Sequence, residues 1–342
     1  MNKEKIIQSG PIIAICDSEE DYCYRLDEYL RTNFSLEFEI YDFTNSNSLN
    51  EFQNKENIMV LIISEKEYED VEKNICQNII LLQEDNAGIN QVAENDNIVR
   101  INKYVPSKMI LNSLVDVCME LPDNILGKNF EGSSALDIIG SISLNDKDAQ
   151  MALAVELASE LGQKEKVLFL ELSPFSCLSK YTQISCEENL SDLLYYMDCN
   201  PDKFLLYFDR MVKDYDGCKI IAPIISPSQL KSITKIQWNA LFKAIQNKTE
   251  FKKIIINLSE GIDGLYEILS RSSKIYMTVS NDEISQYKIN QYETLLKENE
   301  YEKILAVTQR IIKPSYIATG TLNNAGYKRW AKELIGGLEN GT

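Results

Sequence analysis

Short apolar runs alternate with longer amphipathic stretches along the first 121 residues. PIIAICD and NIMVLIIS are continuous apolar runs, which is typical of strands that a parallel sheet buries on both faces. Helical periodicity separates the runs, and PSKMILNSLVDVCMEL closes the region with Pro106 in its first turn. The pattern predicts a sheet with intervening helices, and its five strands are expected at 11–17, 36–43, 57–64, 78–84 and 97–103.

The same alternation returns from residue 136 with longer helices. LDIIGSIS, KVLFLELS, CKIIAPIIS and FKKIIINLS are strand-like, and they span 136–143, 166–173, 218–226 and 251–259. DAQMALAVELASELG is typical of a helix that ends at Gly162, and NLSDLLYYM of a helix that Asn189 caps. SKIYMTVS, YEKILAVT and a last helix, NAGYKRWAKELIGGL, complete the pattern at 273–280, 301–308 and 324–338.

A stretch between these two regions has the composition of a linker. LGKNFEGSSALD (126–137) mixes Gly, Ser and polar residues. A chain of 342 residues is also long for one domain. We therefore expect two α/β domains, each with a parallel sheet between two layers of helices. They cover residues 1–125 and 135–342, and a linker at 126–134 joins them.

Histidine is absent, and its absence excludes several kinds of chemistry. Ser-His-Asp and Cys-His nucleophile systems need an imidazole, as do many zinc sites. The eight cysteines include no C-x-x-C pair, so we expect reduced, mostly buried thiols rather than disulfides or a zinc site.

Acidic residues are concentrated in the first part of the chain. Residues 1–134 hold 11 Lys/Arg and 25 Asp/Glu, a net charge of −14, whereas residues 135–342 hold 24 and 27, a net charge of −3. Such a surface repels phosphate backbones, so we expect no nucleic-acid binding. No apolar stretch approaches the ~20 residues that span a bilayer, and the N-terminus lacks the cleavage site of a signal peptide. The expected location is the cytoplasm.

The strand IAICD and the residues after it resemble the start of response-regulator receiver domains, in which two adjacent acids hold magnesium. Here Asp17 supplies one acid and Ser18 replaces the other. Ser64 ends the third strand, where receivers carry the aspartate that accepts phosphate, and Lys103 matches the lysine that follows their fifth strand. The resemblance implies a flavodoxin-like fold.

The replaced acids indicate a pseudo-receiver. Without a carboxylate at Ser64 there is no nucleophile for an aspartyl phosphate, and the loss of an acid at Ser18 weakens a site for a hard cation. We therefore expect no metal at these positions. The simplest interpretation of Asp17 and Lys103 is a surface pair left at the strand ends. The domain would then offer partners a folded surface.

The segment IIGSISLNDKDAQMALAVELA runs from a strand through a short polar loop into an Ala/Leu-rich helix, which is the layout of a phosphate-binding loop. It resembles the MinD/ParA class of P-loop ATPases, whose glycine-rich loop ends in G-K-T. The resemblance implies that every part of the phosphate cradle is changed: Asp146 and Ala149 replace glycines, Gln150 replaces the lysine, and Met151 and Ala152 replace the hydroxyl residues.

The loop from Ser143 to Asp148 therefore lacks the groups that hold a triphosphate. Glycines let backbone N–H groups surround the phosphates, and lysine neutralises their charge. A carboxylate at Asp146 or Asp148 would instead face the polyphosphate, and at an effective dielectric of 20 a like charge at 4 Å costs about 4 kcal/mol. This cost exceeds the ~2 kcal/mol that a helix N-terminus contributes at most.

Two further strand ends are altered. KVLFLELS matches the strand that carries paired aspartates in ParA-like ATPases, and here it has Glu171 and Ser173. FKKIIINLS matches the strand that ends in a magnesium-associated aspartate, and Asn257 takes that place. The resemblance thus implies no catalysis and no cofactor. The alternative is a divergent ATPase that binds ATP and magnesium through a rearranged loop.

The order of the two domains resembles the TadZ and CpaE proteins, which help to localise pilus-assembly machinery at the cell pole. The resemblance implies a non-catalytic scaffold that contacts pilus or secretion components and is recruited to the pole or to the inner face of the membrane. A homodimer would form without nucleotide. A DNA partition factor is a third possibility, which would need a basic face.

The last helix has two interpretations. One face is apolar and basic residues lie beside it, as on helices that bind membrane surfaces. We expect instead that this face covers the sheet of its own domain. The apolar residues are Tyr327, Trp330, Ala331, Leu334, Ile335 and Leu338, and the basic residues are Lys328, Arg329 and Lys332.

Overall fold

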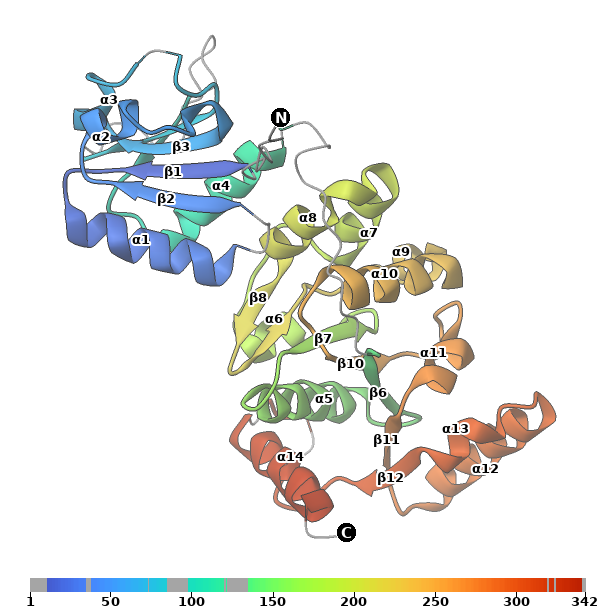
Figure 1. The fold of residues 1–342 in the computed structure, drawn as a ribbon. Helices are drawn as coiled ribbons and strands as arrows, with labels where there is room; N and C mark the ends of the chain where they lie inside the picture. Colours follow the sequence, from blue (N-terminus) through green and yellow to red (C-terminus); the bar gives the residue numbers. More distant parts are fainter. Residues whose placement is uncertain are drawn as a thin grey trace. The chain divides into compact units, whose positions relative to one another are not determined.

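The computed structural model describes residues 11–34, 38–72, 74–84, 98–119, 121, 135–318, 320–322 and 324–339. The chain divides into two compact units, Met1–Lys128 and Asn129–Thr342, and each unit has its own sheet (Figure 1). The linker expected at 126–134 lies outside the described residues.

The first unit contains a sheet of five parallel strands in the order β2-β1-β3-β4-β5. All residues of β1 and nearly all of β3 are buried, as their continuous apolar runs predict. The strands are β1 (Ile12–Cys16), β2 (Glu39–Phe43), β3 (Ile58–Ser64), β4 (Ile79–Gln83) and β5 (Ile98–Asn102).

Helices cover both faces of this sheet. On one face lie α1 (Glu20–Asn33) and α4 (Ser107–Met119), which contact each other (Figure 1). The buried side chains of α1 are Cys23, Leu26 and Leu30, at the spacing of one helical face. The other face is covered by two short helices, α2 (Ser46–Asn50) and α3 (Glu65–Tyr68), and the 3-10 helix η1 (Lys55–Asn57) directly precedes β3.

The second unit contains a sheet of seven strands in the order β12-β11-β6-β10-β7-β9-β8. Strand β6, which leads into the loop that resembles a phosphate-binding loop, lies near the centre between β10 and β11. The strands are β6 (Asp137–Ser143), β7 (Val167–Leu172), β8 (Lys213–Tyr215), β9 (Cys218–Ile220), β10 (Lys253–Leu258), β11 (Lys274–Val279) and β12 (Thr308–Ile312).

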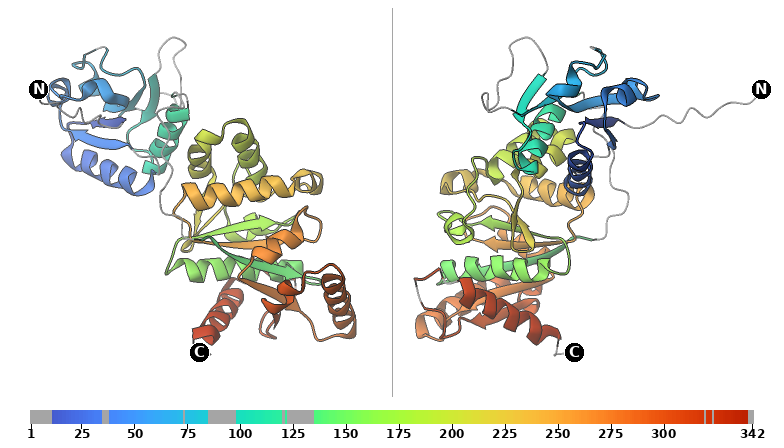
Figure 2. Two further views of the ribbon diagram at one scale, coloured as in Figure 1. Left: turned by 45° about the vertical axis from the view of Figure 1, so that its right-hand side comes forward. Right: turned by 90° about the vertical axis from the view of Figure 1, so that its left-hand side faces the viewer.

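Helices also cover both faces of the second sheet (Figure 2). Helices α5 (Lys147–Gly162) and α14 (Asn324–Glu339) pack together on one face, and α10 (Lys235–Lys248) and α11 (Leu265–Arg271) lie on the other. The remaining helices are α6 (Leu178–Thr182), α7 (Leu190–Cys199), η3 (Pro201–Lys203), α8 (Phe204–Met211), α9 (Pro227–Ser232), α12 (Glu283–Glu298) and α13 (Glu302–Ala306). Because α5 is covered by the sheet and by α14, residues 149–159 are all buried.

Three details differ from the predicted pattern. Strand β8 pairs antiparallel with β9, so the second sheet is not wholly parallel. The run CKIIAPIIS is a strand only up to Ile220, because Pro223 lacks the N–H that a ladder needs and the chain continues as a loop. YEKILAVT forms α13, and strand β12 begins only at its last residue, Thr308.

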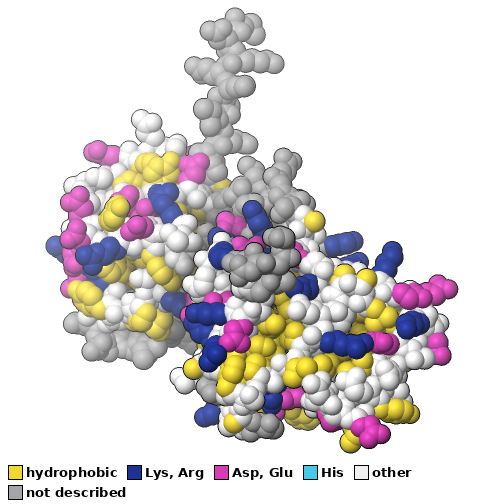
Figure 3. Space-filling view, turned by 90° about the horizontal axis from the view of Figure 1, so that it is seen from below, with side chains coloured by type: hydrophobic (Ala, Val, Ile, Leu, Met, Phe, Trp, Pro, Cys, Tyr) yellow, Lys and Arg dark blue, Asp and Glu magenta, His cyan; other side chains and the backbone are white. Residues whose placement is uncertain are grey.

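The last helix packs onto its own unit, as expected. Tyr327, Trp330 and Ala331 are buried in one core with α5 and the sheet. The basic residues beside them form ion pairs: Lys328 with Asp216, Arg329 with Glu333, and Lys332 with Glu160. Basic and acidic side chains are interspersed over the face of the molecule in Figure 3. Among the described residues, no helix combines the length and the apolarity needed to cross a membrane.

Candidate functional sites

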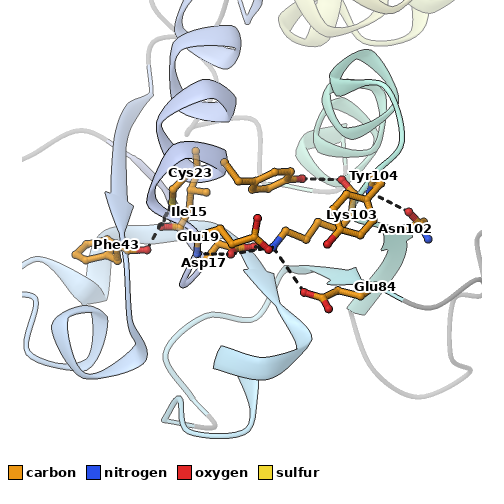
Figure 4. Close-up of polar contacts among 10 residues, drawn as sticks. Ile15, Asp17, Glu19, Cys23, Phe43, Glu84, Asn102, Lys103 and Tyr104 are labelled. Carbon is orange, nitrogen blue, oxygen red and sulfur yellow. Dashed lines mark hydrogen bonds and ion pairs between the residues drawn. The ribbon is translucent and has the colours of Figure 1, made fainter.

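The carboxyl edge of the first sheet holds a buried ion pair (Figure 4). Asp17 follows β1 and Lys103 follows β5, and their side chains are 0% and 1% exposed. Lys103 Nζ donates a hydrogen bond of 3.0 Å to Asp17 Oδ1, and it lies 2.8 Å from Oδ2 without hydrogen-bond geometry. The interpretation of these residues as a surface pair is therefore wrong. The ammonium of Lys103 also lies over the ring of Tyr22, 4.8 Å from the ring centroid.

Two more carboxylates reach Lys103 from the surface. Its Nζ lies 2.8 Å from Glu19 Oε1 and 3.8 Å from Glu84 Oε1, and both glutamates are more than half exposed. Burial lowers the pKa of Lys103, but the hydrogen bonds to Asp17 and Glu19 outweigh burial and leave the pKa raised. The ammonium is therefore charged and has three acidic neighbours.

The other receiver-like positions do not add to this cluster. Ser18 is exposed. Ser64 is buried at the end of β3, and its Oγ makes no hydrogen bond to a described residue. Ser64 itself brings no carboxylate to the end of β3, and the carboxylates of Asp17, Glu19 and Glu84 already have the ammonium of Lys103 among them. In the described part of the chain, no group of three or more Asp, Glu or Cys side chains is arranged to hold a metal ion.

In the second unit, the loop after β6 is held by its own side chains. Ser143 Oγ donates a hydrogen bond of 3.0 Å to the carbonyl of Thr278 on β11, and it accepts bonds from the N–H groups of Asn145 and Asp146. Asp146 caps α5, since its Oδ1 accepts a bond of 3.0 Å from the N–H of Ala149. The helix N-terminus thus already has a carboxylate on it.

Gln150 has a structural role at the position that the resemblance gives to lysine. Its side chain is 2% exposed, and Nε2 donates to the carbonyls of Ser141 and Leu258 at 2.7 and 2.9 Å. These carbonyls belong to β6 and β10, so the amide joins two central strands near their carboxyl ends. Met151 is buried in the core and Asp148 is exposed.

Three lysines lie at this loop, and only Lys147 belongs to the loop's own sequence. Lys147 pairs with Glu260 at 2.7 Å, and both side chains are about half exposed. Lys313, which follows β12, lies 2.9 Å from Asp146 Oδ2. Lys288, on α12, donates to Asn145 Oδ1 at 2.7 Å. The last two are more than 140 positions away along the chain, so no local pattern could indicate them.

The altered strand ends form a buried pair. Asn257 Nδ2 donates a hydrogen bond of 2.8 Å to Glu171 Oε1, and both residues are 1% exposed. Burial raises the pKa of Glu171 to about 8, although the bonds from Asn257 and from the Ser173 N–H act in the opposite direction. Near neutral pH this carboxyl is therefore largely protonated.

No family model matches the chain, and no curated protein matches it. Solved structures similar to the chain include a ParA family ATPase from Chlorobium tepidum TLS, which is 17% identical, with 58% of this chain and 99% of that chain covered and a TM-score of 0.40. A cobyrinic acid a,c-diamide synthase from Mycobacterium smegmatis is 12% identical over 60% and 96% of the two chains, with a TM-score of 0.42.

A plasmid partition protein from Borrelia burgdorferi is also similar. It is 12% identical over 59% of this chain and 86% of that chain, with a TM-score of 0.40. All three TM-scores are below 0.5, so these likenesses carry no argument about what the chain binds.

Proposed function

We propose that the chain is a non-catalytic scaffold for protein–protein contacts, with a receiver-like unit followed by a MinD/ParA-like unit as in TadZ and CpaE proteins. The order β2-β1-β3-β4-β5 supports the receiver-like part, because flavodoxin-like folds have this strand order. A loop and a long helix after a central parallel strand support the P-loop-like part.

The capping of α5 by Asp146 is the observation that carries this proposal. The carboxylate accepts the N–H of Ala149 and pairs with Lys313, so both the helix N-terminus and a nearby cation already have an anionic partner. A phosphate would have to displace this carboxylate or approach it closely. Gln150 cannot assist, because its amide N–H groups bond to Ser141 and Leu258.

The first unit supports the same function. Its carboxyl edge has Ser64 in place of a phosphate acceptor, and the ammonium of Lys103 neutralises Asp17 from within. The partners proposed for the scaffold are components of a pilus or secretion system, and the chain acts in the cytoplasm, at the cell pole or the inner face of the membrane. Nucleic acid is not a proposed partner, and α14 does not take part in membrane contact.

Calorimetric titration of the full chain with ATP and magnesium tests this function. We expect no saturable heat up to millimolar ATP. A dissociation constant at or below the micromolar range would overturn the proposal. The matched variant, Asp146→Ser with Gln150→Lys, removes the capping carboxylate and adds a cation. If the two side chains are what excludes nucleotide, affinity rises in this variant, and a thermal shift with ATP reports it independently.

A divergent ATPase remains the second candidate, because Lys288 and Lys313 add positive charge to the loop that the sequence alone does not indicate. This function requires ATP binding by the unmodified chain. It also requires that Lys313→Met weaken ATP binding about tenfold or more, since a charged hydrogen bond to phosphate contributes about 1.5–3 kcal/mol. Lys248→Met, on α10, is the control, because Lys248 bonds to the carbonyl of Pro201 outside this loop.

A further inference from the structure

Four buried side-chain oxygens lie on neighbouring strands of the second sheet, and none has a hydrogen-bond partner among the described residues. They are Glu171 Oε2 on β7, Asn257 Oδ1 on β10, Ser141 Oγ on β6 and Thr278 Oγ1 on β11. All four residues are at most 3% exposed. A buried polar group without a partner is unfavourable, so four of them in one part of a sheet need an explanation.

The four side chains lie on the face of the sheet that α5 covers. Side chains two positions apart on a strand point to the same side of the sheet. The residues two positions earlier share a buried core with α5, and they are Phe169, Ile255, Ile139 and Tyr276. The four oxygens therefore belong to one layer between α5 and the sheet, which is named here the polar layer.

Three residues of the polar layer stand side by side in the parallel ladder. Asn257 pairs in register with Glu171 on one side and with Ser141 on the other. Its Nδ2 donates to Glu171 Oε1 on β7, so its Oδ1, at the opposite end of the amide, is directed to the side on which β6 lies. Ser141 has the shortest side chain of the three, which leaves more room beside its hydroxyl than a longer residue would.

The chemistry of the polar layer favours a small neutral ligand. Glu171 is its only ionisable side chain, and burial raises the pKa of that carboxyl to about 8. A protonated carboxyl and a hydroxyl donate, and an amide oxygen accepts, so the ligand must do both. Water does both. Its two hydrogen bonds of about 2.8 Å span about 4.5 Å, close to the ~4.8 Å between neighbouring strands.

We propose that the polar layer is a binding site for ordered water, in which one water molecule bridges Asn257 Oδ1 and Ser141 Oγ across β10 and β6. Glu171 Oε2 and Thr278 Oγ1, at the two ends of the layer, bond to water as well. Each oxygen then has the partner that a buried polar group requires. Such water needs neither a protein partner nor a nucleotide, so the site is separate from the proposed scaffold function.

A crystal structure of the full chain tests this site, with rubidium as the monovalent cation and without magnesium. We expect a density peak about 2.7–3.2 Å from both Asn257 Oδ1 and Ser141 Oγ, with no anomalous signal at the rubidium edge. Three results would overturn the proposal: no peak, a direct hydrogen bond between the two side chains, or a peak with rubidium signal, which would mean a cation site.

Ser141→Ala separates bound water from a dry layer. If water bridges the two side chains, the variant loses the density peak and its thermal midpoint falls by about 2–4 °C, because the water and the Asn257 amide lose a partner. In a dry layer, removal of an unpartnered hydroxyl leaves the midpoint unchanged or raises it, and either result would contradict the proposal.

Ser272→Ala is the matched control. Ser272 is also buried, but its Oγ donates a hydrogen bond of 3.1 Å to the carbonyl of Ile268 within the chain. This variant should keep the density peak in the polar layer, and loss of the peak would show that it does not depend on Ser141. Both readouts are obtained without nucleotide or a partner, so failure here leaves the proposed scaffold function untouched.

Discussion

At the scale of single residues, burial decides what a charged side chain does. Lys103 and Asp17 are buried, whereas in the same unit Lys55 and Glu72, 2.9 Å apart, have side chains that are 34% and 56% exposed. An exposed pair contributes about 0–1 kcal/mol to stability. Removing one partner of a buried pair costs about 3–5 kcal/mol, because the other charge is left without compensation.

Lys103→Met is therefore expected to destabilise the first unit by about 3–5 kcal/mol, and Lys55→Met by less than about 1 kcal/mol. The double variant Lys103→Met with Asp17→Asn should recover most of the loss, since it removes both charges. Urea unfolding followed by circular dichroism gives the three values. If Lys103→Met costs no more than Lys55→Met, the ammonium of Lys103 is not the counter-ion of Asp17.

Glu171 gives a prediction for the pH dependence of stability. Its pKa is raised from 4.5 to about 8 in the folded chain, so the fold holds a proton that the unfolded chain releases above about pH 4.5. The contribution of this proton to the free energy of unfolding is fully present below pH 4.5 and is lost as the pH rises through 8.

Glu171→Gln has no such proton, so we expect it to be more stable than wild type at pH 9 by on the order of 3 kcal/mol, with a much smaller difference at pH 5. Urea unfolding at the two pH values measures this change. Glu260→Gln, at a glutamate whose side chain is about half exposed, is the control for replacing a glutamate by glutamine. A Glu171→Gln effect of equal size at both pH values would mean that Glu171 is already ionised in the folded chain.

At the scale of elements, continuous apolar runs predicted the interior strands correctly, but they did not predict the two edge strands of the second sheet. Strand β8 has the sequence KDY and β12 the sequence TQRII, and most of their residues face solvent. A strand at a sheet edge has few apolar residues, so the pattern did not predict β8. It predicted a strand at YEKILAVT in place of β12, because the apolar residues of that segment, which belong to α13, form a strand-like run.

The candidate site of the second unit was predictable only in part. The strand, loop and helix around Asp146 are contiguous in sequence, so their apolar pattern and the capping residue could be recognised. The approach of Lys288 and Lys313 depends on where α12 and β12 lie in the folded sheet. The hydrogen bonds of the buried Gln150 side chain likewise depend on carbonyls from two strands, those of Ser141 on β6 and Leu258 on β10.

The N-cap of α5 gives a prediction at this scale. Asp146→Asn should keep the bond to the Ala149 N–H, because asparagine caps helices as well as aspartate does, and should lose only the ion pair with Lys313. Asp146→Ala loses the cap as well, so it should cost about 1 kcal/mol more. Urea unfolding compares the two, with Asp148→Ala as an exposed first-turn control. Equal losses of unfolding free energy in Asp146→Asn and Asp146→Ala would show that the capping bond does not stabilise the fold.

At the scale of the whole molecule, the chain combines two compact units of very different charge. Each unit has a separate sheet and its own apolar core, which surrounds β1 and β3 in the first unit and α5 in the second. Residues 1–128 hold 11 Lys/Arg and 24 Asp/Glu, a net charge of −13, and residues 129–342 hold 24 and 28, a net charge of −4. Like charges on one compact unit repel one another and oppose folding.

Expressed separately, residues 1–128 and residues 129–342 should therefore each unfold in one cooperative transition but respond differently to salt. The screening length falls from about 10 Å at 0.1 M to about 3 Å at 1 M, which weakens the self-repulsion of the more acidic fragment. We expect NaCl to raise the thermal midpoint of 1–128 by several degrees more than that of 129–342, as measured by circular dichroism. Sucrose, which is excluded from protein surfaces without screening charge, should stabilise both fragments without this difference. Equal salt shifts would show that net charge does not limit the stability of the first unit, and a non-cooperative 1–128 fragment would show that it is not an independent folding unit.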